Sequence, residues 1–178
     1  MIKSSREFTD KDYRYLSKSL EIYFLERYNR ISRFRKFDSG QGDMKYPIIA
    51  RLRAKMFAKE CVEEVKAGKR FCVANLQVSG TLGFMVGKVS KKKVALLMNW
   101  FIDGADMTDG SRRMSLELEK RFLAECEDLG AVRVLAVSNE RDNLFVNALE
   151  TLDFEEVGWK RGNVYYGKRM SLNGSKKR

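Results

Sequence analysis

The chain has 178 residues, a mass of 20.6 kDa and a net charge of +11, with 44% hydrophobic and 33% charged residues. This is the composition of one globular domain, and without an apolar run of membrane-spanning length or a hydrophobic signal core we predict a soluble, cytoplasmic protein. Histidine is absent, which excludes Ser-His-Asp and Cys-His nucleophile systems and zinc sites that need histidine.

The N-terminal third predicts a short strand followed by two helices. A strand is expected from Ile2 to Phe8, and Thr9 or Asp10 can cap a helix that runs to about Tyr28. Residues 32–46 are basic and then rich in glycine, which predicts a long loop. A second helix is expected at 47–66, with Gly68 as its stop.

The remaining elements alternate between strands and helices. Strands are expected at 71–78, 81–89 and 94–102, joined by short connections that favour antiparallel pairing. A helix then ends at Gly130, and the apolar run 132–138 predicts a central strand that is buried on both faces. A helix at 143–152 precedes two last strands at 154–159 and 163–170. The resulting order, β-α-α-β-β-β-α-β-α-β-β, predicts an α/β domain with a mixed sheet.

The charge is distributed unevenly. Residues 1–70 carry +8, residues 111–159 carry −5, and residues 160–178 carry 7 basic residues and no acidic one. This asymmetry predicts one face suited to a polyanion. Five cations between aromatic residues are candidates for nucleic-acid or acceptor binding, although such a run is also typical of a solvated helix end: Arg27, Arg30, Arg33, Arg35 and Lys36.

The three cysteines, Cys61, Cys72 and Cys126, are widely spaced and form no CxxC pair. We expect free thiols and no metal site.

The segment LGAVRVLAVSNERDNLFVNALETLDFEEVG resembles the GNAT superfamily of acyl-CoA-dependent N-acetyltransferases. Its landmarks are Leu129-Gly130-Ala131, the strand 132–137, Leu152-Asp153-Phe154 and Val157-Gly158. With the element order, the resemblance covers about 71–159 closely and most of the chain loosely. It implies a single GNAT-like domain over 1–170, with 1–70 on the acceptor side, 71–159 on the cofactor side, and a disordered basic tail at 171–178.

The resemblance also implies acetyl-CoA as acyl donor, no metal, and direct attack by an amine on the thioester. The family's phosphate-binding loop would fall on Gly110-Ser111-Arg112-Arg113-Met114-Ser115, and the strand end at Phe101 and Ile102 would contact the cofactor. An Asn-containing turn would fall on Asp142 or Asn143. Dimers are common in this family, so the resemblance leaves both a monomer and a homodimer as alternatives.

Two positions depart from the family. Arg113 and Ser115 stand where the loop has glycines; Arg112 and Arg113 can bind phosphate through their guanidinium groups, or Arg113 can block the cradle. Leu149 stands where a tyrosine commonly protonates the leaving thiolate. Tyr165 and Tyr166 are replacement acids or sheet-packing residues.

Asp103 is a candidate base, or one of several loop carboxylates. The sequence thus leaves three functions open. They are an active N-acyltransferase with a polyanionic or nucleic-acid-borne acceptor, an inactive GNAT-like protein that binds nucleic acid or a protein partner through its basic N-terminal half, and a nucleic-acid-modifying enzyme.

Overall fold

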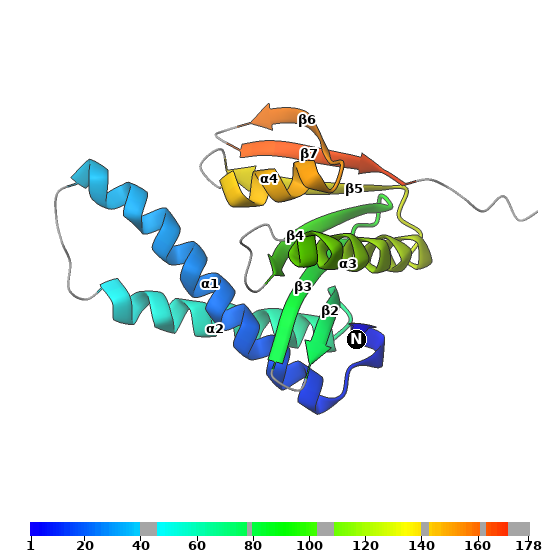
Figure 1. Cartoon of the computed structure of the whole chain (residues 1–178), viewed down its shortest axis with the longest axis horizontal. Coiled ribbons are helices and arrows are strands. Elements are labelled where there is room, and N and C mark those ends of the chain that lie inside the picture. Colours follow the sequence, from blue (N-terminus) through cyan, green and yellow to red (C-terminus); the bar gives the residue numbers. More distant parts are fainter. Residues whose placement is uncertain (40–45, 78–79, 103–108, 140–142, 161–162, 171–178) are drawn as a thin grey trace, which may run out of the picture.

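A computed structural model describes residues 1–39, 46–77, 80–102, 109–139, 143–160 and 163–170. They form a seven-stranded sheet in the order β1-β2-β3-β4-β5-β7-β6, with helices packed on it (Figure 1). The β4–β5 pair is parallel and the other neighbouring strands are antiparallel. The elements are β1 (Ile2–Ser4), the 3₁₀ helix η1 (Ser5–Glu7), α1 (Asp10–Ser39), α2 (Tyr46–Lys66), β2 (Phe71–Gln77), β3 (Gly80–Val89), β4 (Val94–Ile102), α3 (Asp109–Asp128), β5 (Arg133–Asn139), α4 (Asn143–Thr151), β6 (Glu155–Lys160) and β7 (Asn163–Arg169).

The predicted element order is confirmed, and two N-terminal details are wrong. The strand expected over Ile2 to Phe8 stops at Ser4, because Ser4 and Glu7 form a reciprocal capping box that starts the 3₁₀ turn. The loop expected from residue 32 is helical as far as Ser39, as part of α1. No glycine or proline interrupts residues 10–39, so nothing in the sequence stops the helix earlier.

Each face of the sheet has its own apolar core. On one face Leu16 and Leu20 of α1 and Ala58 of α2 pack against β2 and β3. On the other face Leu118 and Phe122 of α3 pack with Leu149 of α4 on the sheet. The helices therefore form two layers, α1 with α2 and α3 with α4, around the sheet.

β5 is central but is covered on one face. Val134, Ala136 and Ser138 are buried, whereas Val137 on the opposite face is 40% exposed. The expectation of burial on both faces was wrong because α1 and α2 pack on β2 and β3, and no described residue of β5 belongs to that core. The face of β5 on the α1/α2 side is consequently open.

Helix α3 lies close to the sheet at Gly87. A Cβ built on Gly87 would come within 2.7 Å of ring carbons of both Phe122 and Phe71. No side chain fits that gap without movement of the two rings, so glycine sets how near α3 approaches β3.

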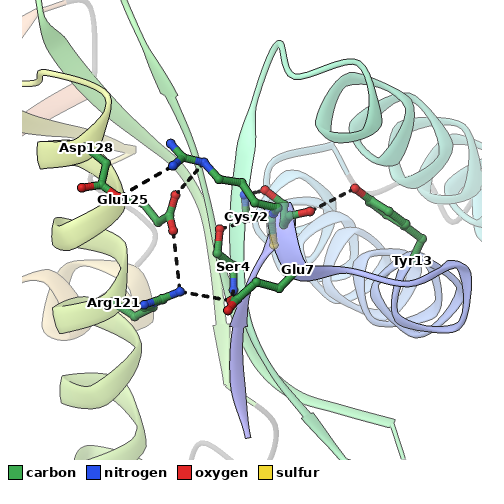
Figure 2. Close-up of polar contacts among 9 residues, drawn as sticks. Ser4, Glu7, Tyr13, Cys72, Arg121, Glu125 and Asp128 are labelled. Carbon is green, nitrogen blue, oxygen red and sulfur yellow. Dashed lines mark hydrogen bonds and ion pairs between the residues drawn. The ribbon is translucent and has the colours of Figure 1, made fainter.

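The C-terminal half of α3 is tied to the N-terminal segment by ion pairs (Figure 2). Arg6 Nε lies 3.4 Å from Glu125 Oε2, and Arg121 Nη2 lies 3.0 Å from Glu7 Oε2 and 3.9 Å from Glu125 Oε1. Arg6 also reaches Asp128 at 3.7 Å. These contacts tie the C-terminal half of α3 to the segment that contains Arg6 and Glu7.

None of the described helices has an apolar stretch that could cross a bilayer.

Candidate functional site

Strands β4 and β5 diverge halfway along their length. They pair from Val94 opposite Arg133 to Leu97 opposite Ala136, and not beyond. From there β4 continues to Ile102 paired with β3, while β5 continues to Asn139 paired with β7. Past Leu97 the edges of β4 and β5 that face one another carry backbone N–H and C=O groups that form no β4–β5 hydrogen bond.

A β-bulge starts the divergence. Gly87 pairs with Leu97 and Val86 pairs with Asn99, so Met98 is an extra residue in β4. Leu97 belongs to the core on the α3 side, whereas the partner of Asn99, Val86, belongs to the α1/α2 side. A bulge bends its strand and increases its twist, and this one stands directly after the last β4–β5 pair.

Helix α3 begins beside the end of β4 (Figure 1). Because α3 starts at Asp109, the segment 110–115 forms its first turns rather than a loop. The N–H groups of the first turn, from about Asp109 to Ser111, have no partner within the helix. With the positive end of the helix dipole they form an anion-binding position.

The Arg113 side chain does not fill the divergence. It is 85% exposed and its Nε lies 3.5 Å from Glu117 Oε1, one turn further along α3. Met114 packs against the core and Ser115 is buried. Gly110, Ser111 and Arg112 lie in the first turns of α3, and the side chains of Ser111 and Arg112 are outside the described part of the structure.

The indole of Trp100 brings an unpaired donor to the divergent part of β4. Trp100 is half-buried against the α3-side core, and among the described residues no acceptor meets its Nε1. A buried N–H without an acceptor is costly, so this group is suited to a ligand. Nothing in the sequence distinguishes Trp100 from an ordinary core residue or indicates that its N–H lacks an acceptor.

The two candidate tyrosines lie on opposite faces of β7. Tyr165 pairs with Val137, just past the point where β4 leaves β5, and is partly exposed on the open face. Tyr166 is 6% exposed within the α3/α4-side core, and burial, with smaller contributions from Glu150 and Glu156, raises its pKa. Tyr165 is thus the tyrosine accessible beside the divergence.

On the α1/α2 face, a hollow of about 200 Å³ adjoins the bulge. Phe24 and Phe57 contribute aromatic rings whose centroids lie 5.7 Å apart. Neither the bulge nor this hollow could be anticipated from the sequence, because both depend on the register between strands. The lining residues are Phe24, Phe57, Glu60, Cys61, Arg70, Met98 and Asn99.

Aromatic stacking fixes Phe101 on the same face. Its ring lies 5.5 Å from that of Phe84 and 6.2 Å from that of Tyr23. Phe101 can therefore offer a ligand in the divergence its backbone rather than its ring. Ile102, the last residue of β4, pairs with Gly83.

Of the basic run on α1, Arg27 has a described side chain. Its Nη1 donates to the hydroxyl of Tyr23 at 3.1 Å. The other four residues lie on the last turns of α1, which extend past the sheet (Figure 1), with side chains outside the described residues: Arg30, Arg33, Arg35 and Lys36.

Other predicted site residues are placed in part. Asp103, Asp142 and the tail 171–178 lie outside the described residues, and Asn143 is the first residue of α4. Leu149 is 1% exposed in the core. Within the described ranges, no group of three or more Cys, Asp or Glu side chains is arranged to hold a metal.

The thiols are free and buried. Cys61, Cys72 and Cys126 are at most 1% exposed. Burial raises the pKa of all three thiols, that of Cys126 to about 12. They are therefore poor nucleophiles at neutral pH.

No protein-family model and no curated protein matches the sequence, but solved structures match the fold. An aminoglycoside 6'-acetyltransferase type Ii superposes with a TM-score of 0.67 at 15% identity, covering 98% of this chain and 99% of that one. An N-acetyltransferase (PaiA) from Thermoplasma acidophilum, in complex with coenzyme A, gives 0.63 at 13% identity, covering 95% and 99%.

An acetyltransferase of the GNAT family from Staphylococcus aureus Mu50 gives a TM-score of 0.59 at 10% identity, covering 96% of this chain and 100% of that one. At these identities the similarity concerns the fold. The predicted GNAT-like architecture is confirmed.

Proposed function

We propose that this chain, which has the fold of GNAT-family N-acetyltransferases, is an acyl-CoA-dependent N-acyltransferase that transfers an acetyl group. The observation that carries the proposal is the divergence of β4 from β5 at the Met98 bulge, beside the first turn of α3. A long, thin ligand can pass between the strands there and present its phosphates to the helix N-terminus.

Three features of the chain fit acyl-CoA. The first turn of α3 offers unpaired N–H groups to a pyrophosphate. The edge of β4 beyond Leu97 offers unpaired backbone groups to an extended chain. The Arg113 guanidinium points along α3 to Glu117 instead of into the gap, so an arginine in place of the family's glycine leaves the approach open.

Acyl-CoA would supply an activated thioester. A backbone N–H of β4 between Met98 and Ile102 would donate to the thioester carbonyl as negative charge develops on its oxygen. The acceptor amine would attack that carbon directly, so that the new C–N bond replaces the C–S bond, the amine loses a proton and the thiolate gains one. Tyr165 beside the divergence is our candidate proton donor, and Asp103 our candidate base.

We further propose that the acceptor amine is carried by a polyanion such as a tRNA. The cations of residues 27–36 lie on the last turns of α1, the helix that also supplies Phe24 to the hollow beside the bulge. Arginines present forked donors that match phosphate.

A second candidate is a GNAT-like protein without catalysis that binds nucleic acid or a protein partner through its basic N-terminal half. The specific observation in its favour is Leu149, which is buried in the core and cannot donate a proton. Under this proposal Tyr165 would have no catalytic effect.

Thermal-shift titration with acetyl-CoA tests the proposal. Ligand at a hundred times its dissociation constant should stabilise the fold by about 2.7 kcal/mol. We expect Arg113 to exchange Glu117 for the bound pyrophosphate and Arg112 to contact it as well, so Arg112→Ala/Arg113→Ala should reduce the shift. The matched pair Arg51→Ala/Arg53→Ala, exposed on α2, should retain it. No shift with the wild-type chain would reject acyl-CoA use.

Thiol release from acetyl-CoA in the presence of aminoacyl-tRNA separates the two candidates. An active enzyme should release thiol, and Tyr165→Phe should lower kcat at least tenfold with little change in KM. A CoA-dependent shift without thiol release for aminoacyl-tRNA or for small amines would favour the inactive binding protein.

A further inference from the structure

A second concentration of charge lies at the opposite end of the sheet from the divergence. Here β3 ends, β4 and β5 begin and β7 ends, with Val94 opposite Arg133 and Arg133 opposite Arg169. We call it the basic end. Its exposed cations are Lys66, Lys69, Lys88, Lys91, Lys92, Lys93, Arg133 and Arg169.

The basic end includes a hollow of about 330 Å³. Five of the side chains that line it are cationic and none is acidic: Arg6, Lys66, Lys69, Arg70 and Lys88. Phosphate is an anion of suitable size and charge for such a recess.

The two arginines of the hollow are neutralised and the three lysines are not. Arg6 pairs with Glu125 and Asp128, and Arg70 pairs with Glu64. Lys66 lies over the ring of Tyr13, with 4.9 Å from its Nζ to the ring centroid. Among the described residues Lys66, Lys69 and Lys88 have no ion-pair partner. Within the described part of the chain, these three ammonium groups around the hollow thus have no anionic partner.

Helix capping does not account for this arrangement. The dipole of α2 favours a cation in its last turn, which explains Lys66. It does not explain Lys88 on β3, the three lysines of the turn 91–93, or Arg133 and Arg169 on β5 and β7.

The basic end is too wide for one small anion. Its cations lie on β3, β5 and β7 (Lys88, Arg133 and Arg169) and in the segments that lead into β2 and β4 (Lys69 and residues 91–93), and these five strands are consecutive in the sheet. At about 4.8 Å between neighbouring strands this row measures roughly 19 Å. Duplex phosphates follow one another every 3.4 Å along the axis of each strand, so the row is long enough to contact several phosphates on the side of the duplex that faces it.

We propose that the basic end binds the phosphate backbone of a nucleic acid without regard to base sequence. The lysines 91–93 and Arg133 face successive phosphates, and one phosphate enters the hollow at Lys69 and Lys88. The aromatic residues of the hollow are not free for stacking on bases, because Phe71 is buried and the Tyr13 hydroxyl donates to Ser5 O at 3.3 Å. A flat bilayer would not fill the recess.

This surface is separate from the acceptor region proposed for residues 27–36, which lies on the other side of the molecule in Figure 1. It does not depend on acyl transfer.

Fluorescence anisotropy with a labelled duplex of roughly 20 base pairs, at several salt concentrations, tests the proposal. The variant Lys69→Gln/Lys88→Gln/Lys92→Gln removes three charges from the basic end. The control Arg14→Gln/Lys18→Gln/Lys120→Gln removes three charges from exposed positions on α1 and α3, none of which forms an ion pair with another described residue. Both variants have the same net charge.

The wild-type affinity should fall steeply with salt. The basic-end variant should bind about tenfold more weakly at moderate salt, with a slope of log affinity against log salt reduced by about 2 to 3, and the control should stay within about twofold of the wild type. If both variants lost the same affinity for the duplex, the loss would be explained by net charge alone, and the proposal would be overturned.

Two further outcomes would also overturn it. One is binding to phosphatidylserine vesicles or inorganic pyrophosphate without binding to the duplex. The other is duplex binding insensitive to salt. The acetyl-CoA thermal shift of the basic-end variant should equal that of the wild type. Failure of the nucleic-acid proposal can therefore be distinguished from failure of the proposed acyl transfer.

Discussion

Asp12 is the residue on which the start of α1 depends. Its Oδ2 accepts from Thr9 N at 2.8 Å, from Thr9 Oγ1 at 2.9 Å and from Lys3 Nζ at 3.0 Å. Asp12 N in turn faces Thr9 Oγ1 at 3.4 Å, a reciprocal cap of the helix. Burial acts to raise the pKa of Asp12, but these hydrogen bonds outweigh it and lower the pKa overall.

This lowered pKa predicts acid sensitivity. Because the unfolded chain takes up the proton first, the stabilisation by Asp12 is present above the unfolded pKa of about 4 and is lost as pH falls through the folded pKa. Asp12→Asn should lower the free energy of unfolding by about 1 kcal/mol at pH 7. In urea melts between pH 7 and 3 its deficit should shrink toward acid, and a deficit independent of pH would contradict this assignment.

At the scale of elements, the Met98 bulge determines where β4 leaves β5. Leu97 and Asn99 face opposite sides of the sheet with Met98 between them. Since regular strands alternate from one residue to the next, removal of Met98 would leave both neighbours on their present faces while straightening the strand.

Deletion of Met98 should therefore preserve the fold and lose the cofactor site. We expect a cooperative melt for the deletion variant and at least a tenfold weaker acetyl-CoA response in the thermal-shift titration. Met98→Leu, which keeps the extra residue and nearly its volume, should respond like the wild type. A folded deletion variant that responds fully would show that the bulge does not open the strands.

Most elements could be predicted from the sequence because their signals are local. Apolar spacing identified the strands, and Gly68 and Gly130, with φ of 69° and 74°, mark helix ends. The extension of α1 to Ser39 was missed because basic residues were read as loop. The bulge, the hollow and the one-sided cover of β5 depend on contacts between distant segments, which local patterns do not encode.

At the scale of the whole molecule, Glu125 joins the N-terminal segment to α3. Its side chain is 5% exposed and faces Arg6 on one side and Arg121 on the other (Figure 2). Both arginines are about half exposed, so either one can still compensate the buried carboxylate when the other is absent.

We predict strong coupling between these arginines. Arg6→Gln and Arg121→Gln should each cost about 0 to 1 kcal/mol, whereas the double variant should lose at least about 1 kcal/mol more than their sum, because Glu125 then lacks a cation. Adding Glu125→Gln should restore most of that excess. Urea melts at pH 7 measure the four variants against the wild type, and additive losses would contradict the coupling.

The short parallel ladder between β4 and β5 has a mechanical consequence. Among the described residues, the β1–β4 half of the sheet is joined to the β5–β7 half by a ladder of four residue pairs and by one more backbone hydrogen bond, from Val132 N to Lys93 O at 2.9 Å. The apolar core under α3 and α4 spans both halves on one side of the sheet. The two halves of the sheet can therefore rotate relative to one another about that shared core. A ligand that binds between β4 and β5 would then widen their separation by rotating the two halves as rigid units. The backbone hydrogen bonds within each half would stay intact.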